Sequence, residues 1–153
     1  MTTRWLDSPI GGLRVHASAG LITAIDFDAT VRGTPTPDPL LDEAERQLTD
    51  YFAGERRDFD LPIANDGSEF QQKVWSELVK IPYGETATYG EIAARLGYDN
   101  TVSRAVGAAN GANPIPVVVP CHRVVGSDGK LTGYAGGVER KRILLDLEQP
   151  GLF

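Results

Sequence analysis

Apolar and polar residues alternate near the start of the chain in the way that is typical of β-strands. Residues 13–17 alternate with a period of two, residues 18–20 are suited to a turn, and residues 21–27 resume the alternation. We therefore expect an antiparallel hairpin. The segment 34–39, Thr-Pro-Thr-Pro-Asp-Pro, is expected to exclude both a helix and a sheet ladder, because three of its six residues are prolines without an amide hydrogen.

A helical period follows the prolines. Between residues 40 and 52 one face is apolar and the opposite face is charged, and Gly54 is a typical helix stop. The apolar positions are Leu41, Ala44, Leu48, Tyr51 and Phe52. Residues 59–63 are typical of a short edge segment. Residues 1–65 are therefore expected to form a small lobe with one antiparallel sheet and one helix.

The pattern becomes mainly helical after residue 65. Ser68 followed by Gln71 is the residue pair of a capping box, and the helix that it opens is expected to reach Pro82. Its apolar stripe consists of Phe70, Val74, Trp75, Leu78 and Ile81. Thr88 with Glu91 predicts the start of a second helix in the same way.

A third helix is predicted shortly after the second. Gly97 ends the second helix, and either Asn100 or Thr101 is expected to cap a helix that ends near Asn110. Two short helices joined by a turn with glycine are typical of a helix-turn-helix, and equally of a helical hairpin in any α-rich domain. The third helix has mostly small side chains and Arg104 as its one charge, which suits close approach to a narrow groove or to a neighbouring element.

Length and composition place the chain among ordinary globular proteins. It has 153 residues, of which 41% are hydrophobic and 24% are charged, enough for one domain or for two lobes. The longest aliphatic run, residues 117–119, is too short to span a bilayer, and the N-terminus lacks a signal-peptide core. We expect a soluble cytoplasmic α+β protein, with the sheet-and-helix lobe of residues 1–65 packed on a mainly helical lobe of residues 66–153.

The net charge of −6 argues against binding to nucleic acid. The acidic excess is uneven, because residues 1–65 carry six basic and eleven acidic side chains, whereas residues 66–153 carry nine and ten. The C-terminal lobe can therefore still present a locally positive surface.

The candidate chemistry lies at the only cysteine. Cys121 follows an apolar, proline-flanked run over residues 115–120 that is expected to be a buried β-like segment, and His122 is its neighbour. A single cysteine excludes an internal disulfide and a cysteine-rich zinc site. A lone cysteine is most often an inert buried residue. An adjacent imidazole favours a reactive one, because the thiolate is the nucleophilic form and a base must remove its proton.

An imidazole that acts as a base needs a hydrogen-bond acceptor that holds its ring in the right orientation. A helix predicted over residues 138–148 offers Glu139, Asp146 and Glu148, each of which is exposed by default. The sequence pattern does not choose among them.

Several motifs, taken together and in order, resemble those of the O6-alkylguanine-DNA alkyltransferases, also called methylated-DNA–protein-cysteine methyltransferases. The match is dense from Phe70 to Glu148 and looser through residues 8–11 and 51–55. The segments that carry it are Phe70-Gln71-Gln72-Lys73-Val74-Trp75, Ile81-Pro82-Tyr83-Gly84-Glu85-Thr86, Thr88-Tyr89-Gly90, Arg104-Ala105-Val106-Gly107, Asn113-Pro114, Pro120-Cys121-His122-Arg123-Val124-Val125-Gly126, Thr132-Gly133-Tyr134-Ala135-Gly136-Gly137 and the helix from Lys141.

The resemblance implies a DNA repair protein. Its substrate would be duplex DNA with O6-alkylguanine, or with O4-alkylthymine, whose damaged base is flipped out from the minor-groove side. The alkyl group would pass irreversibly to Cys121, so each molecule would act once.

The resemblance also implies residue roles. Cys121 would be the nucleophile, His122 would draw off its proton through a water, and Glu148 would hold His122. Asn113 would support the active-site turn, and Tyr89 would donate a proton to the departing guanine.

Further positions are implied to contact the DNA or the flipped base. Arg104 would enter the duplex in place of the flipped base, and Tyr134 would line the base pocket. The backbone at Cys121, Val124 and Ala135 would read the edge of the base. Two small residues of the Arg104 helix, Ala105 and Gly107, would lie against the DNA.

The main alternative is a non-enzymatic alkyltransferase-like protein that binds damage and leaves repair to others. In those relatives the cysteine is replaced, so the intact Cys121 favours the enzyme. A transcriptional regulator that used the helix-turn-helix alone would leave the segment around Cys121 and His122 unexplained. A cysteine hydrolase would need an oxyanion hole, and no feature of the sequence indicates one. No metal or organic cofactor is expected. Some relatives carry a zinc ion held by cysteines and histidines, and Cys121, His16 and His122 are too few to build that site. A monomer without an obligate protein partner or membrane contact is expected.

Overall fold

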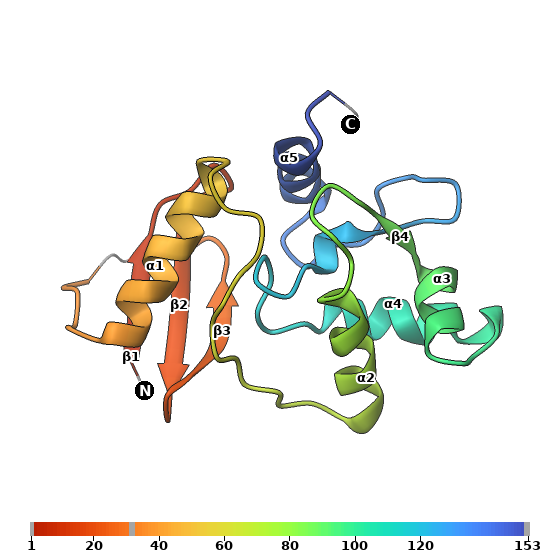
Figure 1. Cartoon of the computed structure of the whole chain (residues 1–153), viewed down its shortest axis with the longest axis horizontal. Coiled ribbons are helices and arrows are strands. Elements are labelled where there is room, and N and C mark those ends of the chain that lie inside the picture. Colours follow the sequence, from red (N-terminus) through yellow and green to blue (C-terminus); the bar gives the residue numbers. More distant parts are fainter. Residues whose placement is uncertain (1, 31–32, 152–153) are drawn as a thin grey trace. The chain divides into compact units, whose positions relative to one another are not determined.

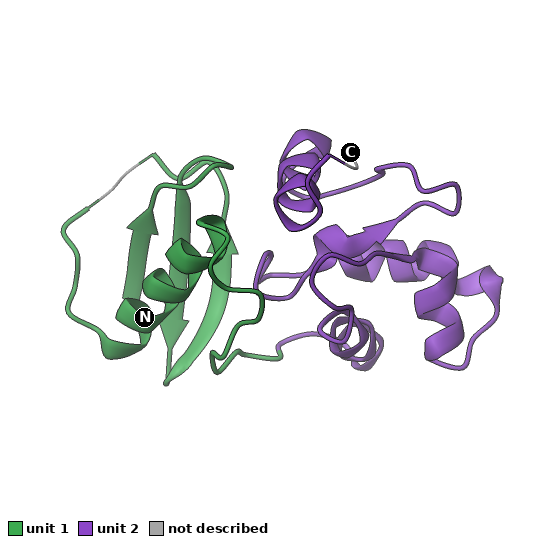
Figure 2. Cartoon of the chain, turned by 45° about the horizontal axis from the view of Figure 1, so that its top comes forward, with its two compact units in different colours: residues 1–65 green, residues 66–153 purple. Residues whose placement is uncertain are grey.

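The computed structural model describes residues 2–30 and 33–151. It divides into two compact units, residues 1–65 and residues 66–153, which are coloured separately in Figure 2. Strands dominate the first unit and helices the second, so the chain is an α+β protein as predicted. None of the helices in the described ranges is long and apolar enough to cross a lipid bilayer.

The first unit is a three-stranded antiparallel sheet with one helix on its face (Figure 1). Its strands, in the order in which they are hydrogen-bonded, are β1 (Thr2–Leu6), β2 (Leu13–Ser18) and β3 (Leu21–Asp26). β2 and β3 form the predicted hairpin, with a bulge at His16 and Ala17. β1 was not predicted from the sequence. It is an edge strand whose pairing with β2 completes the sheet.

The helix α1 (Pro39–Phe52) packs its apolar face on this sheet. Four of the five predicted apolar positions are buried, and Phe52 is half-buried. The prediction that the proline segment excludes a helix is wrong at its last residue, because Pro39 is the first residue of α1. Proline is tolerated there, since the first amides of a helix have no partner within it. The carboxylate of Asp38 caps the next two amides.

The predicted edge segment at residues 59–63 is reduced to one bridge. Ile63 pairs in parallel with Ile22. The amide of Ile22 donates to the carbonyl of Pro62, and the amide of Ala64 donates to the carbonyl of Ile22, both at 2.8 Å.

The second unit contains four α-helices, two short 3-10 helices and a short parallel strand pair in its described part. The α-helices are α2 (Glu69–Leu78), α3 (Tyr89–Arg95), α4 (Ser103–Gly111) and α5 (Val138–Glu148), and the strands are β4 (Ala87–Thr88) and β5 (Val124–Val125). The strand pair was not predicted, because strands of two residues have no readable alternation. It joins the residue before α3 to the segment after Cys121.

Both predicted capping boxes are present. Ser68 with Gln71 begins α2, and Thr88 with Glu91 begins α3. The α2 helix ends at Leu78 rather than near Pro82. The amides of Lys80 and Ile81 then form tighter turns, in which each bonds to the carbonyl three residues earlier.

The helices α3 and α4 pack against each other as the predicted helix-turn-helix (Figure 1). Gly97 ends α3 in the left-handed region with φ +86°. The predicted cap of the next helix is wrong. Asp99 caps a short 3-10 helix, η1 (Asn100–Val102), and α4 continues from it without a side-chain cap of its own.

The segment at residues 115–120 is buried as predicted except for the half-buried Val118, but it is not an extended strand. The amide of Val119 donates to the carbonyl of Ile115 at 2.9 Å, which closes a tight turn. Val117 has φ +74°, a backbone conformation that is uncommon for a β-branched residue. This turn leads directly to Cys121.

Candidate active site

Cys121 begins a short 3-10 helix, η2 (Cys121–Arg123), and its side chain is buried with only 4% of the residue exposed. Asn113 holds the turn in front of it. The Asn113 amide group donates to the carbonyl of Val119 at 2.8 Å and accepts from the amide of Ile115 at 3.0 Å. It also hydrogen-bonds the thiol. One side chain therefore fixes both ends of the turn and the sulfur atom.

Burial raises the pKa of the Cys121 thiol to about 11. A hydrogen bond from Asn113, the charge of Lys141 and the hydroxyl of Tyr134 oppose this increase. The thiol is therefore protonated at neutral pH in the free protein, and a base must remove its proton for it to act as a nucleophile.

His122 and Glu148 form a buried hydrogen-bonded pair with the geometry expected of a base and its orienting group. The Nε2 atom of His122 lies 2.7 Å from a carboxylate oxygen of Glu148, and both side chains are almost completely buried. An ionised carboxylate can only accept, so Nε2 carries the hydrogen and Nδ1 keeps its lone pair. Nδ1 is buried and has no hydrogen-bond partner among the described residues. Burial lowers the pKa of His122, so the ring is neutral and able to accept a proton.

Arg123 completes this arrangement. Its guanidinium donates two hydrogen bonds to Glu148, at 2.8 and 3.1 Å, and a third to the carbonyl of Ile81 at 2.6 Å. Burial by itself raises the pKa of Glu148, but the hydrogen bonds and charges of His122 and Arg123 lower it to about 2. Glu148 is thus a buried ionised carboxylate. The default expectation of exposure is wrong for Glu148, whereas Glu139 and Asp146 are exposed.

Tyr89 lies at the first position of α3 and is half-buried. Its phenol oxygen is 3.2 Å from the hydroxyl of Thr132. A Cβ atom added to Gly107 would lie 3.7 Å from the Tyr89 ring, so α4 approaches the ring closely at this glycine. A hollow of about 630 Å³ opens beside Tyr89. Its polar lining includes Thr88, Asn100, Ser103 and Ser127.

The other expected contact residues occupy different environments. Arg104 and Ala105 are exposed on α4, and within the described part of the chain Arg104 makes no hydrogen bond or ion pair. Tyr134 is buried against the thiol, and burial raises the pKa of its hydroxyl. Val124 is fully buried in β5, and Ala135 is exposed. Asn113 and Tyr134 thus lie close enough to the thiol to affect its pKa, whereas Arg104 is exposed on the surface of α4.

Three polar residues around the site were not assigned from the sequence. Asn110, at the end of α4, is 2% exposed and donates to the carbonyl of Cys121 at 3.3 Å. Lys141 is fully buried and donates to the carbonyl of Thr132 at 2.7 Å, and burial lowers its pKa to about 8. Arg123 is the third. Of these three residues, only Asn110 could have been noticed in the sequence, as an amide side chain within a helix of mostly small residues.

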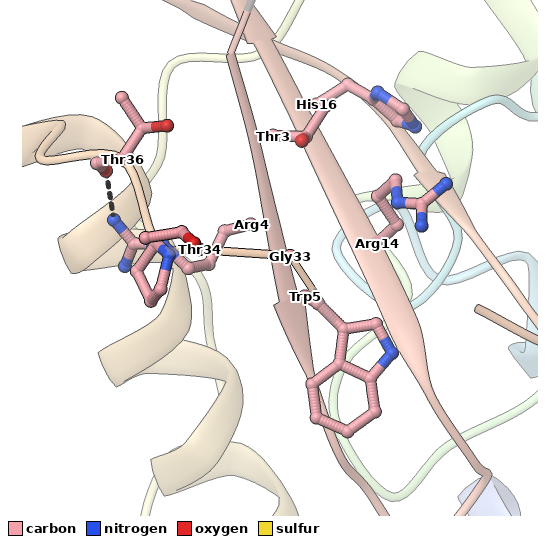
Figure 3. Close-up of a pocket in the computed structure, with 9 residues that line it drawn as sticks. Thr3, Arg4, Trp5, Arg14, His16, Gly33, Thr34 and Thr36 are labelled. Atoms are coloured by element: carbon pink, nitrogen blue, oxygen red, sulfur yellow. Dashed lines mark hydrogen bonds between the residues drawn. The ribbon is translucent and has the colours of Figure 1, made fainter. Parts of the chain in front are cut away.

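The first unit has a separate hollow of about 260 Å³ next to β1 and β2, shown in Figure 3. Three of its side chains make contacts within the unit. Arg4 donates to Thr36, Asp42 and Glu45, and the indole of Trp5 donates to the carbonyl of Ala29. His16 is 2.6 Å from Asp26. These contacts give the residues around this hollow a structural role.

Comparisons with known proteins agree with this geometry. Residues 69–150 match the family model for the DNA binding domain of 6-O-methylguanine DNA methyltransferase, and residues 1–65 match the model for its ribonuclease-like domain. The methylated-DNA–protein-cysteine methyltransferase of Mycobacterium tuberculosis H37Rv is 49% identical over 151 residues, 95% of this chain and 91% of the relative. The corresponding protein of Methanosarcina acetivorans is 47% identical, over 93% of this chain and 94% of its own.

The solved structures agree as well. The crystal structure of Mycobacterium tuberculosis OGT in complex with DNA matches with a TM-score of 0.86 and 50% identity, over 96% of this chain and 92% of that chain. An O6-methylguanine DNA methyltransferase from Methanococcus jannaschii matches with a TM-score of 0.70 and 27% identity, over 99% and 95% of the two chains. The chain therefore belongs to the family of methylated-DNA–protein-cysteine methyltransferases.

Proposed function

We propose that this protein repairs duplex DNA by transferring an alkyl group from the O6 atom of guanine to the sulfur of Cys121. The observation that carries the proposal is the buried pair of His122 and Glu148 next to the buried thiol of Cys121, in a member of this family whose cysteine is intact. The intact cysteine also weighs against the alternative of a damage-binding protein without transfer activity.

The reaction is a single displacement. The thiol proton moves through a water to Nδ1 of His122, and the resulting imidazolium is stabilised by the Glu148 carboxylate, 2.7 Å from Nε2. The sulfur then attacks the alkyl carbon, the bond from that carbon to O6 breaks, and its electron pair goes to the guanine. Tyr89 donates a proton to a ring nitrogen, so the base leaves as a neutral purine. A thioether has no facile leaving reaction, and each molecule therefore acts once.

Access to the lesion requires that the base leave the duplex. The exposed side of α4 has small side chains at Ala105 and Ala108, which let the helix backbone approach the minor groove. Arg104 projects from the same helix without an internal partner among the described residues. In this mode Arg104 occupies the space that the flipped base leaves, and Tyr134 lies against the base in the pocket.

The test is the intact mass of the protein after incubation with a duplex that contains one O6-methylguanine. We expect a gain of one CH2 unit per molecule that does not increase with excess DNA, because the acceptor is consumed. The same duplex with unmodified guanine is the control and should leave the mass unchanged. An unchanged mass together with selective lesion binding would assign the protein to the damage-binding class instead.

Arg104→Ala is expected to slow repair of duplex DNA by about 10- to 100-fold and to leave the reaction with free O6-benzylguanine nearly unchanged. Only the duplex requires base extrusion, which costs a few kcal/mol. Single-turnover rate constants on both substrates measure the difference. Arg95→Ala, which removes an exposed cation at the end of α3, is the matched control for loss of charge. Equal slowing of Arg104→Ala on both substrates would contradict the role in base extrusion.

A further inference from the structure

Thr132 lies in the loop between β5 and α5 and makes contacts with two residues that belong to different helices. Its hydroxyl oxygen is 3.2 Å from the phenol oxygen of Tyr89, at the start of α3. Its backbone carbonyl accepts a hydrogen bond of 2.7 Å from the ammonium of Lys141, in α5. At Thr132 the backbone of the loop is therefore held by Lys141, and the side chain contacts Tyr89.

The hydrogen bond from Lys141 holds the backbone of the loop in place at Thr132. Lys141 is fully buried although it is charged, and a buried ammonium needs a strong acceptor. The Thr132 carbonyl supplies one. Lys141 is also close enough to Cys121 for its charge to favour the thiolate. Thr132 thus contacts both a lysine near the nucleophile and the phenol that is proposed to protonate the leaving guanine.

We propose that Thr132 is a positioning residue of the transfer reaction, whose hydroxyl orients the Tyr89 phenol and stabilises the phenolate that forms when Tyr89 gives up its proton. This inference rests on the proposed function, because it assigns Thr132 to the leaving-group half of that reaction.

The chemistry explains why the contact matters more during the reaction than before it. While Tyr89 is neutral, either hydroxyl can donate across the 3.2 Å separation. Once the Tyr89 proton has moved to the guanine, the phenolate has no hydrogen and Thr132 must be the donor. A hydrogen bond to an anion is roughly twice as strong as one between neutral groups. The contact is therefore strengthened in the transition state, which is the condition for it to accelerate the reaction.

The exposure of the pair is consistent with this role. Thr132 is exposed and Tyr89 is half-buried in the free protein, and 3.2 Å is long for a bond between two hydroxyls. A base that enters the site excludes water from the pair. Catalytic hydrogen bonds commonly shorten when the substrate binds.

A double-mutant cycle tests the inference. Thr132→Val removes the hydroxyl with little change of shape and keeps the backbone carbonyl that holds Lys141, and Thr132→Ser keeps the hydroxyl. We expect Thr132→Val to reduce the single-turnover rate constant on the order of tenfold, as for loss of a hydrogen bond to a charged group, with lesion affinity unchanged. Thr132→Ser should stay within about twofold of the original protein, since its hydroxyl can make the same bond.

The decisive comparison uses Tyr89→Phe. If the hydroxyl acts through the phenol, Thr132→Val has no further effect in the Tyr89→Phe protein. Thr49→Val, an exposed threonine of α1, is the matched control and should leave the rate unchanged.

Three results would overturn the inference. The first is an unaltered rate in Thr132→Val, and the second is an equal reduction with and without the Tyr89 hydroxyl. The third is a loss of rate in Thr132→Ser as large as in Thr132→Val. The proposed function fails separately, if the unsubstituted protein shows no transfer to Cys121 at all, and the inference then fails with it.

Discussion

Cys121→Ala is expected to abolish alkyl transfer completely and to leave the affinity for alkylated DNA within a few-fold of the original. The chain has one cysteine, and no other side chain in the site combines a comparable nucleophile with an adjacent base. Thiolate is intrinsically far more nucleophilic than a neutral hydroxyl or amine. The intact mass after incubation with O6-methylguanine DNA, together with a gel-shift titration, measures both properties.

The retained affinity follows from the location of the thiol. Its side chain is buried and small, whereas the surfaces proposed to contact DNA are the exposed residues of α4 and the hollow beside Tyr89. Cys121→Ser is a useful companion because a hydroxyl can keep the hydrogen bond with Asn113. It should also fail to transfer. Loss of binding in both variants would mean that the residue is structural, and a mass gain in Cys121→Ala would reveal a different acceptor.

Glu148→Gln is expected to reduce the rate constant of transfer by about 100-fold or more, which is the size of effect that a positioned base supplies. The carboxylate accepts from Nε2 of His122, and this bond keeps the lone pair on Nδ1. A glutamine side chain presents an NH2 group as well as a carbonyl. If the NH2 group faces His122, the ring reverses its tautomer and Nδ1 can no longer accept the thiol proton. Single-turnover kinetics measure the loss.

The same substitution should destabilise the fold by about 3–5 kcal/mol, because it leaves the guanidinium of Arg123 buried without its counter-charge. Urea unfolding at pH 7 measures this change. Glu139→Gln makes the same chemical change at an exposed position of the same helix and is expected to alter stability by less than about 0.5 kcal/mol. A similar loss in both variants would contradict the role assigned to the buried carboxylate.

The pH dependence of stability gives an independent check. The pKa of Glu148 is lowered from 4.5 to about 2 in the folded protein, so the folded state favours the ionised form. The stability that it contributes is fully present above pH 4.5 and is lost as the pH falls from about 4.5 to about 2. The difference in unfolding free energy between the original protein and Glu148→Gln should therefore shrink across that window. A constant difference would contradict the lowered pKa.

Most of the helical structure could be predicted from the sequence because its signals are local. Ser68 with Gln71 and Thr88 with Glu91 each lie three residues apart, so each capping box is readable without any knowledge of the rest of the fold. The hairpin of β2 and β3 was predicted for the same reason. In contrast, β1 and the pair of β4 with β5 depend on partners distant in the sequence, and short strands give no periodic signal.

The sequence by itself determined the one candidate thiol nucleophile, its neighbouring histidine and the family resemblance, because these depend on residue identity and spacing. By pattern alone, three carboxylates of the predicted helix were candidates to orient the histidine, and only the family resemblance implied Glu148. The tertiary structure shows that Glu148 is the one within hydrogen-bond distance of His122. Glu139, Asp146 and Glu148 are chemically similar, but only the last is enclosed by His122 and Arg123. The contacts of Asn110, Thr132 and Lys141 likewise became visible only in the tertiary structure. Hydrogen bonds act over about 3 Å in space, and the sequence does not state which residues fold to within that distance.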